Sequence, residues 1–171
     1  MRLTVRGGHL TLTPRFDMAY WLMKSEPSEC SIDDLVRAPS HRVPWVGVRN
    51  YQARNFMRDD MRVGDGVLFY HSSCPEPGIA GVCEVACSAY PDATQFDAKN
   101  PYFDAKSSPE NPRWLHVDVK LVRKTRLLPL AEMREAPQLT TMQVLRRGNR
   151  LSITPVTAPE WRAVMKLLDA A

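Results

Sequence analysis

Two short apolar runs joined by a turn constrain the fold of this chain more than any other part of its sequence. Residues 64–72 (GDGVLFYHS) and 79–89 (IAGVCEVACSA) each have the composition of a β-strand, and the intervening SCPEPG is rich in turn-forming residues. Runs this close together pair most easily with each other. The sequence therefore predicts an antiparallel β-hairpin.

A further strand is predicted over residues 114–127, where apolar and polar residues alternate with the period of two typical of a half-buried strand. The face expected to point to the core contains Leu115, Val117, Val119 and Leu121. The opposite, more polar face contains Trp114, His116, Asp118 and Lys120. Trp114 is therefore interpreted either as a base-stacking residue or as a lid over the core.

The remaining elements are short. Residues 90–112 form a long connecting segment, the excursion, between the predicted hairpin and the strand over residues 114–127. Strands are predicted at residues 19–24 and 151–156, and short helices at 51–61, 129–136 and 141–148. Ser31 with Asp34, and Thr157 with Glu160, have the spacing of helix N-terminal caps. Residues 90–112 are rich in Pro, Asp and Ser, and a loop of this length is usually functional or mobile.

The order of these elements favours an α+β fold, a small mixed β-barrel decorated by short helices, over alternating βαβ units. With 171 residues, the chain fits one domain. The strong patterning begins at Met18, so we expect residues 1–17 to be a poorly ordered extension and residues 18–171 to be the domain.

Charge, hydropathy and cysteine content limit the partners and the cellular location expected for this protein. The formal net charge of +4 favours polyanions only mildly. No stretch approaches the roughly 20 apolar residues that span a bilayer, and the first residues make a poor signal peptide. The cysteines and histidines lack metal-ligand spacing, so we expect free thiols, no metal and no cofactor. Free thiols indicate the cytoplasm, with the nucleoid or the nucleus as alternatives.

The segment WVGVRNYQARN, residues 45–55, carries the clearest functional signal. Trp45 offers a stacking face, Asn50 a base-edge amide, and Arg49 and Arg54 planar forks for phosphate. These are the parts needed to hold one nucleotide in a pocket. The alternatives are a core tryptophan, a helix cap at Asn50 and a helix with solvated arginines.

Other polar residues are candidates for the same pocket. They follow predicted strands or lie within them: Lys24, Ser25, Glu26, Tyr70, His71, Ser72 and Ser152. Glu26 could accept a hydrogen bond from the exocyclic amine of cytosine. The plainer interpretation is that the first three form a self-stabilised turn and the others bond their neighbours in the sheet.

Two basic clusters are candidates for phosphate contacts, although such clusters are usually a solvated face. The first contains Arg123, Lys124 and Arg126, and the second contains Arg146, Arg147 and Arg150.

Several motifs together resemble the EVE domain family of the PUA-like superfamily. They are AYWLMKSEP, WVGVRNYQARN, VGDGVLFYHS, YPDATQFD, RWLHVDV and RLSITPV, in that order. The resemblance runs from about residue 18 to the end of the chain. The resemblance implies a PUA-like pseudo-β-barrel with a pocket that accepts a nucleobase, and a modified one in particular, in DNA or RNA.

The leading hypothesis is a non-catalytic nucleic-acid-binding module that captures a modified base such as a 5-substituted cytosine. Its partner would be DNA or RNA, with no membrane, and we expect a monomer. The first alternative is an amidohydrolase similar to ASCH domains, with Lys24 and either Glu26 or Glu84 as the proton-transfer pair. The second alternative is an interaction module that uses residues 90–112 as its contact surface.

Overall fold

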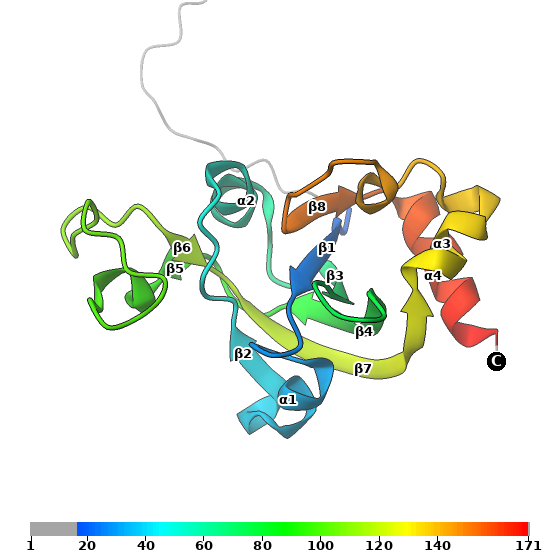
Figure 1. Ribbon diagram of the computed structural model, residues 1–171, viewed down its shortest axis with the longest axis horizontal. Helices are drawn as coiled ribbons and strands as arrows, with labels where there is room; N and C mark the ends of the chain where they lie inside the picture. Colours follow the sequence, from blue (N-terminus) through cyan, green and yellow to red (C-terminus); the bar gives the residue numbers. More distant parts are fainter. Residues whose placement is uncertain (1–16, 171) are drawn as a thin grey trace, which may run out of the picture.

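The computed structural model describes residues 17–170, and its largest element is a curved six-stranded sheet (Figure 1). The strand order is β2–β7–β4–β3–β1–β8, and only β1 and β3 are parallel neighbours. The strands are β1 (Tyr20–Ser25), β2 (Arg42–Pro44), β3 (Gly66–His71), β4 (Gly78–Val85), β7 (Asp118–Pro129) and β8 (Ile153–Val156). Over residues 17–170 the edge strands β2 and β8 do not pair with each other. The pseudo-barrel is therefore an open, curled sheet.

The predicted hairpin is present at the middle of this sheet. Strands β3 and β4 pair in antiparallel register, with Leu68 opposite Val82. The predicted α+β class, with short helices around a mixed sheet, is confirmed. The predicted N-terminal extension, residues 1–17, lies outside the described residues except for Asp17.

Short helices surround the sheet, and the two predicted caps are formed. Ser31 and Asp34 make a complete capping box at the start of α1, and Thr157 accepts a hydrogen bond from the Glu160 amide at the start of α4. The helices are α1 (Ile32–Arg37), α2 (Tyr51–Asn55), the π-helical turn η2 (Phe56–Asp60), α3 (Leu130–Glu135) and α4 (Ala158–Asp169). The 3₁₀ turns are η1 (Pro39–His41), η3 (Ala93–Phe96), η4 (Pro137–Leu139) and η5 (Gln143–Leu145).

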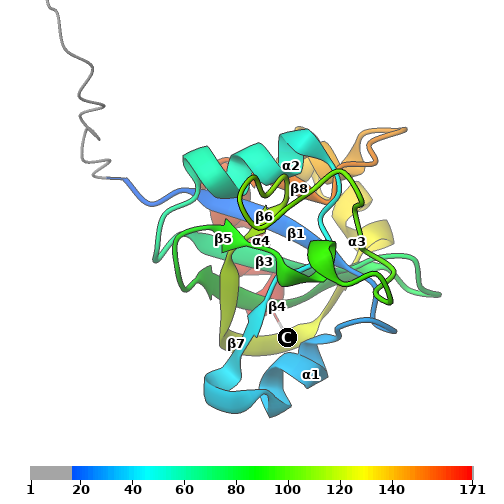
Figure 2. The same ribbon diagram turned by 90° about the vertical axis from the view of Figure 1, so that its left-hand side faces the viewer.

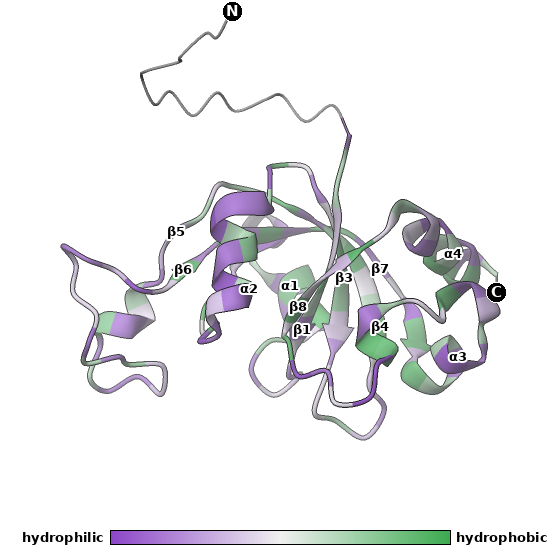
Figure 3. Cartoon of the chain, turned by 90° about the horizontal axis from the view of Figure 1, so that it is seen from above, coloured by the Kyte–Doolittle hydropathy of each residue, from purple (hydrophilic) through white to green (hydrophobic). Residues whose placement is uncertain are grey.

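A hydrophobic core lies on each face of the sheet. Alternation along β1 directs Trp21 and Met23 into one core and Leu22 into the other. The first core includes Trp45 and Phe69, while the second is completed by α3 and α4. Figure 3 shows the contrast between the mainly hydrophobic central strands and the hydrophilic α2.

The strand predicted over residues 114–127 differs from expectation. It divides into β6 (Leu115–His116) and β7, and on the face expected to be polar Trp114, His116 and Asp118 are buried while Lys120 is exposed. His116 is 3% exposed and Asp118 is 9% exposed. Both are buried because Tyr90 and Arg42 cover this face, and each binds one oxygen of the Asp118 carboxylate. His116 and Asp118 therefore make buried hydrogen bonds instead of facing solvent.

The long excursion is an ordered lobe beside the sheet. It starts at β5 (Tyr90–Pro91), which pairs with β6, and projects to one side in Figure 1 and toward the viewer in Figure 2. The amide of Gln95, a fully buried side chain, holds the lobe together through bonds to the carbonyls of Asp92 and Trp114. The lobe is therefore positioned firmly enough to form part of a site.

Candidate nucleic-acid pocket

The main pocket, of about 690 Å³, lies where the curled sheet is left open. Edge strand β2 lines one side, and the segment leading into the other edge strand, β8, lines another. The end of β1 and the excursion complete the walls. Eight of the candidates named from the sequence meet there: Lys24, Ser25, Glu26, Trp45, Arg49, Ser72, Arg150 and Ser152.

Trp45 contributes an apolar wall. Its side chain is 7% exposed and packs edge-on against Phe69, with ring centroids 5.3 Å apart. Its amide donates to the Val117 carbonyl at 2.9 Å, which fixes the backbone beside β2. Trp45 is thus both a core residue and a pocket residue, so the two interpretations of the sequence are compatible.

The end of β1 supplies polar groups to the pocket. Ser25 Oγ donates to the Cys30 carbonyl at 2.7 Å, while the Glu26 carbonyl accepts from the amides of Glu29 and Cys30. These bonds form the turn that was one of the predicted alternatives. The side chains of Lys24 and Glu26 make no hydrogen bond within residues 17–170, and burial lowers the pKa of Lys24. Both therefore remain available to a ligand.

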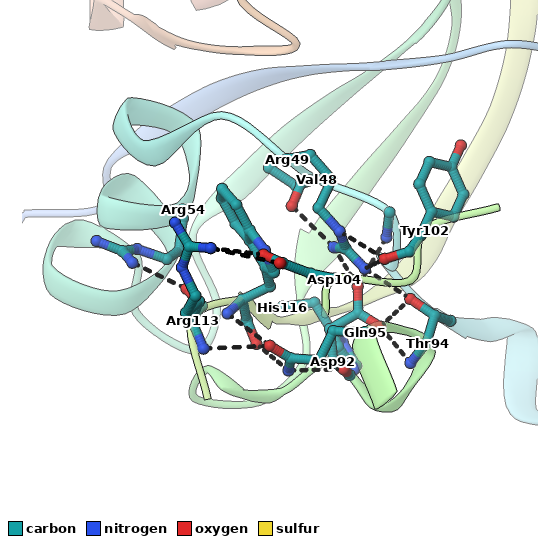
Figure 4. Close-up of polar contacts among 12 residues, drawn as sticks. Val48, Arg49, Arg54, Asp92, Thr94, Gln95, Tyr102, Asp104, Arg113 and His116 are labelled. Atoms are coloured by element: carbon teal, nitrogen blue, oxygen red, sulfur yellow. Dashed lines mark hydrogen bonds and ion pairs between the residues drawn. The ribbon is translucent and has the colours of Figure 1, made fainter. Parts of the chain in front are cut away.

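Arg49 cross-links the pocket to the excursion (Figure 4). Its Nε and Nη2 atoms donate to the Tyr102 carbonyl at 3.0 and 2.7 Å. Nη1 donates to the Val48 carbonyl and the Asp92 carboxylate, and Nη2 also reaches Thr94 Oγ1. A guanidinium has five N–H groups, and these five bonds use all of them. Arg49 therefore positions the excursion and has no donor left for a phosphate.

Asp92 is the acceptor on which several of these contacts converge. Its side chain is buried and accepts from the amides of Gly47 and Thr94 as well as from Arg49. Burial alone would raise the pKa of Asp92, but the hydrogen bonds from Thr94, Gly47 and Arg49 outweigh it and lower that pKa. The carboxylate stays ionised and holds both sides of the pocket together.

Tyr102 forms the outer wall of the pocket, a role that no sequence motif predicted. Its ring lies against Gly47, where an added Cβ would be 2.7 Å from the Tyr102 ring. Gly47 has a φ of +85°, so glycine is required there for two reasons. The Tyr102 hydroxyl donates to Glu29 at 2.6 Å, and this bond raises the pKa of Tyr102 to about 12.

Three candidates near this site are used by the protein scaffold. Asn50 caps α2 by accepting from the Ala53 amide at 3.0 Å, which was its alternative interpretation. Trp114 is 6% exposed and stacks on Tyr51 with centroids 4.8 Å apart, so it acts as a lid over the core. Arg54 lies over the Tyr51 ring and donates to Asn55 and to the Arg113 carbonyl.

Tyr70 and His71 also lie outside the pocket lining. Tyr70 is 3% exposed and belongs to the second core, where burial raises its pKa. His71 Nε2 accepts from the Ile32 amide at 3.0 Å at the start of α1. Any ligand role for these two residues stays a prediction.

The first basic cluster is neutralised by acids. Arg123 pairs with Asp169, Lys124 with Asp33, and Arg126 with Glu132. Each pair joins β7 to one of the helices. Phosphate binding by these cations stays a prediction, and it would require competition with the intramolecular carboxylates.

Residues 17–170 were also compared with the requirements of metal sites, disulfides and membrane-spanning helices. Within residues 17–170, no group of three or more His, Cys, Asp or Glu side chains is arranged to hold a metal ion. All four cysteines, which lie in this range, are free thiols. No helix of residues 17–170 is long and apolar enough to cross a membrane.

An open, curled mixed sheet with a polar pocket at its unpaired edges defines a PUA-like α+β domain. The chain belongs to the EVE domain family, which it matches over residues 19–167.

Relatives of known sequence and structure agree with this assignment. Thymocyte nuclear protein 1 of Homo sapiens is 44% identical over 167 residues, 87% of this chain and 73% of the relative. The structure of human THYN1 in complex with DNA containing 5-methylcytosine has a TM-score of 0.83 at 43% identity, covering 90% of this chain and 99% of that one. A protein from Pseudomonas syringae, PSPTO5229, has a TM-score of 0.82 at 48% identity, covering 87% and 99%.

Proposed function

We propose that this protein binds DNA and takes a modified cytosine into the pocket beside Trp45. One observation carries the proposal: the pocket pairs a buried tryptophan wall with polar side chains that have no partner in residues 17–170. The relationship to human THYN1, solved with DNA containing 5-methylcytosine, supports the choice of ligand. A base that leaves the duplex needs such a combination of apolar surface and edge-reading groups.

The chemistry of cytosine suggests roles for individual residues. The exocyclic amine is a donor, and Glu26 offers a carboxylate acceptor. The ring nitrogen and the carbonyl oxygen of cytosine are acceptors, and Lys24 offers an ammonium donor. A 5-substituent is apolar or weakly polar, and it would lie against Val43, Pro44 or Trp45. The pocket would therefore bind the base by its edge and its substituent.

Fluorescence anisotropy with matched oligonucleotides tests this proposal. The probes are DNA and RNA of one sequence, each with cytosine, 5-methylcytosine or 5-hydroxymethylcytosine, measured at several salt concentrations. We expect tighter binding to one modified DNA probe than to its unmodified counterpart. Equal affinity for all DNA probes would overturn selective recognition, and preference for the RNA set would redirect the proposal to RNA.

A second candidate function is hydrolysis of a modified nucleoside. Lys24 and Glu26 line the same pocket, and burial lowers the pKa of Lys24, which brings an amine closer to the range of a general base. Turnover of an N-acylated cytidine that disappears in Lys24→Ala would support this function. Glu84, the other acid considered, pairs with Lys120 and Gly66 in the sheet register and does not line the pocket.

A further inference from the structure

The second basic cluster lies on the turn that leads into the pocket, which Arg150 lines, and it differs in one respect from the first basic cluster. Arg146, Arg147 and Arg150 are exposed, and within residues 17–170 their side chains make no ion pair and no hydrogen bond. By contrast, Arg123, Lys124 and Arg126 each pair with a carboxylate. Apart from Lys24 inside the pocket, the cations next to the pocket that lack a carboxylate partner in residues 17–170 therefore lie on this one turn.

The turn has a defined shape that does not depend on its arginine side chains. The Asn149 amide donates to the Arg146 carbonyl, and the Asn149 side chain binds the Gln143 carbonyl and the Leu151 amide. Gly148, with a φ of +78°, has no atom within 4 Å of where a Cβ would lie. The turn is thus held by its backbone and Asn149, and its three cations remain free to contact a ligand.

The turn is joined directly to the pocket. Arg150 and Ser152 line the pocket, and the Ser152 carbonyl accepts from the Lys24 amide at 2.8 Å. In Figure 1 this segment is the orange loop between the turns that follow α3 and strand β8. A base inside the pocket stays attached to its sugar and phosphates, which must leave through the rim. Arg150 is at the rim, and Arg146 and Arg147 precede it along the turn.

We infer that Arg146, Arg147 and Arg150 form the surface that binds the DNA phosphates next to the captured base. This inference rests on the proposed function, and it selects one of the two basic clusters. Arginine suits the role because its planar fork binds phosphate oxygens in pairs. Phosphate contacts supply affinity and register, while the pocket supplies the choice of base.

The test is the salt dependence of DNA binding by two matched triple variants. One carries Arg146→Gln, Arg147→Gln and Arg150→Gln. The control carries Arg123→Gln, Lys124→Gln and Arg126→Gln, and so removes the same charge. Circular dichroism checks that both variants are folded. Binding of the duplex carrying 5-methylcytosine, and of its unmodified counterpart, is measured between low and moderate salt by anisotropy.

The logarithm of duplex affinity falls linearly with the logarithm of salt concentration, and each lost phosphate contact makes this slope less steep by about 0.9. In the variant of Arg146, Arg147 and Arg150, called the rim variant, we expect the slope to be less steep by about two to three. This variant should bind both probes more weakly and keep the wild-type ratio of affinities for modified and unmodified DNA. The control should keep the wild-type slope.

The outcomes separate this inference from the proposed function. A wild-type slope in the rim variant, or a reduced slope in the control alone, would overturn the inference while leaving base recognition intact. A reduced slope in the rim variant of a protein without preference for modified DNA would support the phosphate surface and contradict selective recognition. Failure of the wild-type protein to bind DNA would overturn both.

Discussion

The Nη1 atom of Arg49 lies 3.0 Å from Oδ2 of Asp92, and this ion pair joins the segment that carries Trp45 to the excursion that forms the outer wall of the pocket. The Asp92 side chain is only 1% exposed, whereas Arg49 is 21% exposed. The pair is therefore partly shielded from water and surrounded by hydrogen bonds. It makes the pocket a property of the folded scaffold rather than of a loop that closes on a ligand.

Arg49→Lys is expected to destabilise the protein although it keeps the charge. A lysine cannot replace five directed donors, and leaving buried acceptors unpaired costs about 2 kcal/mol or more. Urea unfolding measures the free energy of unfolding. Arg37→Lys is the control, because Arg37 forms an exposed ion pair with Asp34, where the change should be below about 0.5 kcal/mol. Equal stability of the two variants would contradict this role of Arg49.

Gly47→Ala is expected to disturb the outer wall of the pocket. Gly47 and Gly64 have similar positive φ values, +85° and +91°, but an added Cβ meets Tyr102 only at Gly47. Backbone strain should lower the free energy of unfolding of both variants by about 1 kcal/mol. Overpacking against Tyr102 should lower that of Gly47→Ala by about 1–3 kcal/mol more. Thermal or urea unfolding of the two variants separates these effects. DNA binding should weaken in Gly47→Ala and remain unchanged in Gly64→Ala.

His71 is expected to make stability fall as the pH drops from about 7 to 5. Burial lowers the pKa of His71, and its Nε2 must be unprotonated to accept from the Ile32 amide. A free histidine has a pKa of about 6.5, so below that pH the unfolded chain binds more protons than the native state. The stabilisation is complete above this pH and is lost as the pH falls through the lower native pKa.

Unfolding measured at pH 7, 6 and 5 checks this account of His71. His71→Asn keeps a side-chain acceptor that does not titrate. The loss of stability over this range should therefore be smaller in the variant than in the wild-type protein. Identical pH profiles would show that another group causes the effect.

Asn50→Ala is expected to lower stability without changing the choice of base. The side chain caps α2 through the Ala53 amide, and loss of such a cap costs about 1 kcal/mol. Asn50→Asp keeps a capping oxygen and should retain stability. If both variants were as stable as the wild type but lost preference for the modified probe, Asn50 would read the base instead.

Local sequence patterns predicted much of the fold. The hairpin and the caps at Ser31 and Thr157 depend on residues close together in the sequence, and each was expected. The covered face of β6 and β7 was not, because His116 and Asp118 alternate as exposed residues do. Their burial depends on Tyr90 and Arg42, which are distant in sequence.

The role of a site residue was harder to predict where its side chain could bind either a ligand or another part of the protein. Arg49 carries donors suited to a phosphate, but four of its five hydrogen bonds go to the excursion and the fifth goes to the Val48 carbonyl. Gly47 stood inside the segment of interest, and a glycine between Trp45 and Arg49 was a usable signal for close contact. Tyr102 had only its place among the aromatic residues of the excursion, and its partner Glu29 lies 73 residues away.

The most direct measurement fills the pocket and asks whether recognition of the modified base is lost. Ser152→Trp places a large side chain in the pocket, and Ser88→Trp places the same side chain at an exposed position outside it. Affinities for duplexes with cytosine and 5-methylcytosine are measured for both variants and for the wild type. We predict that the preference for the modified duplex falls to none in Ser152→Trp, with weak salt-dependent binding retained, and is unchanged in Ser88→Trp. An undiminished preference in a folded Ser152→Trp protein would contradict capture of the base in this pocket.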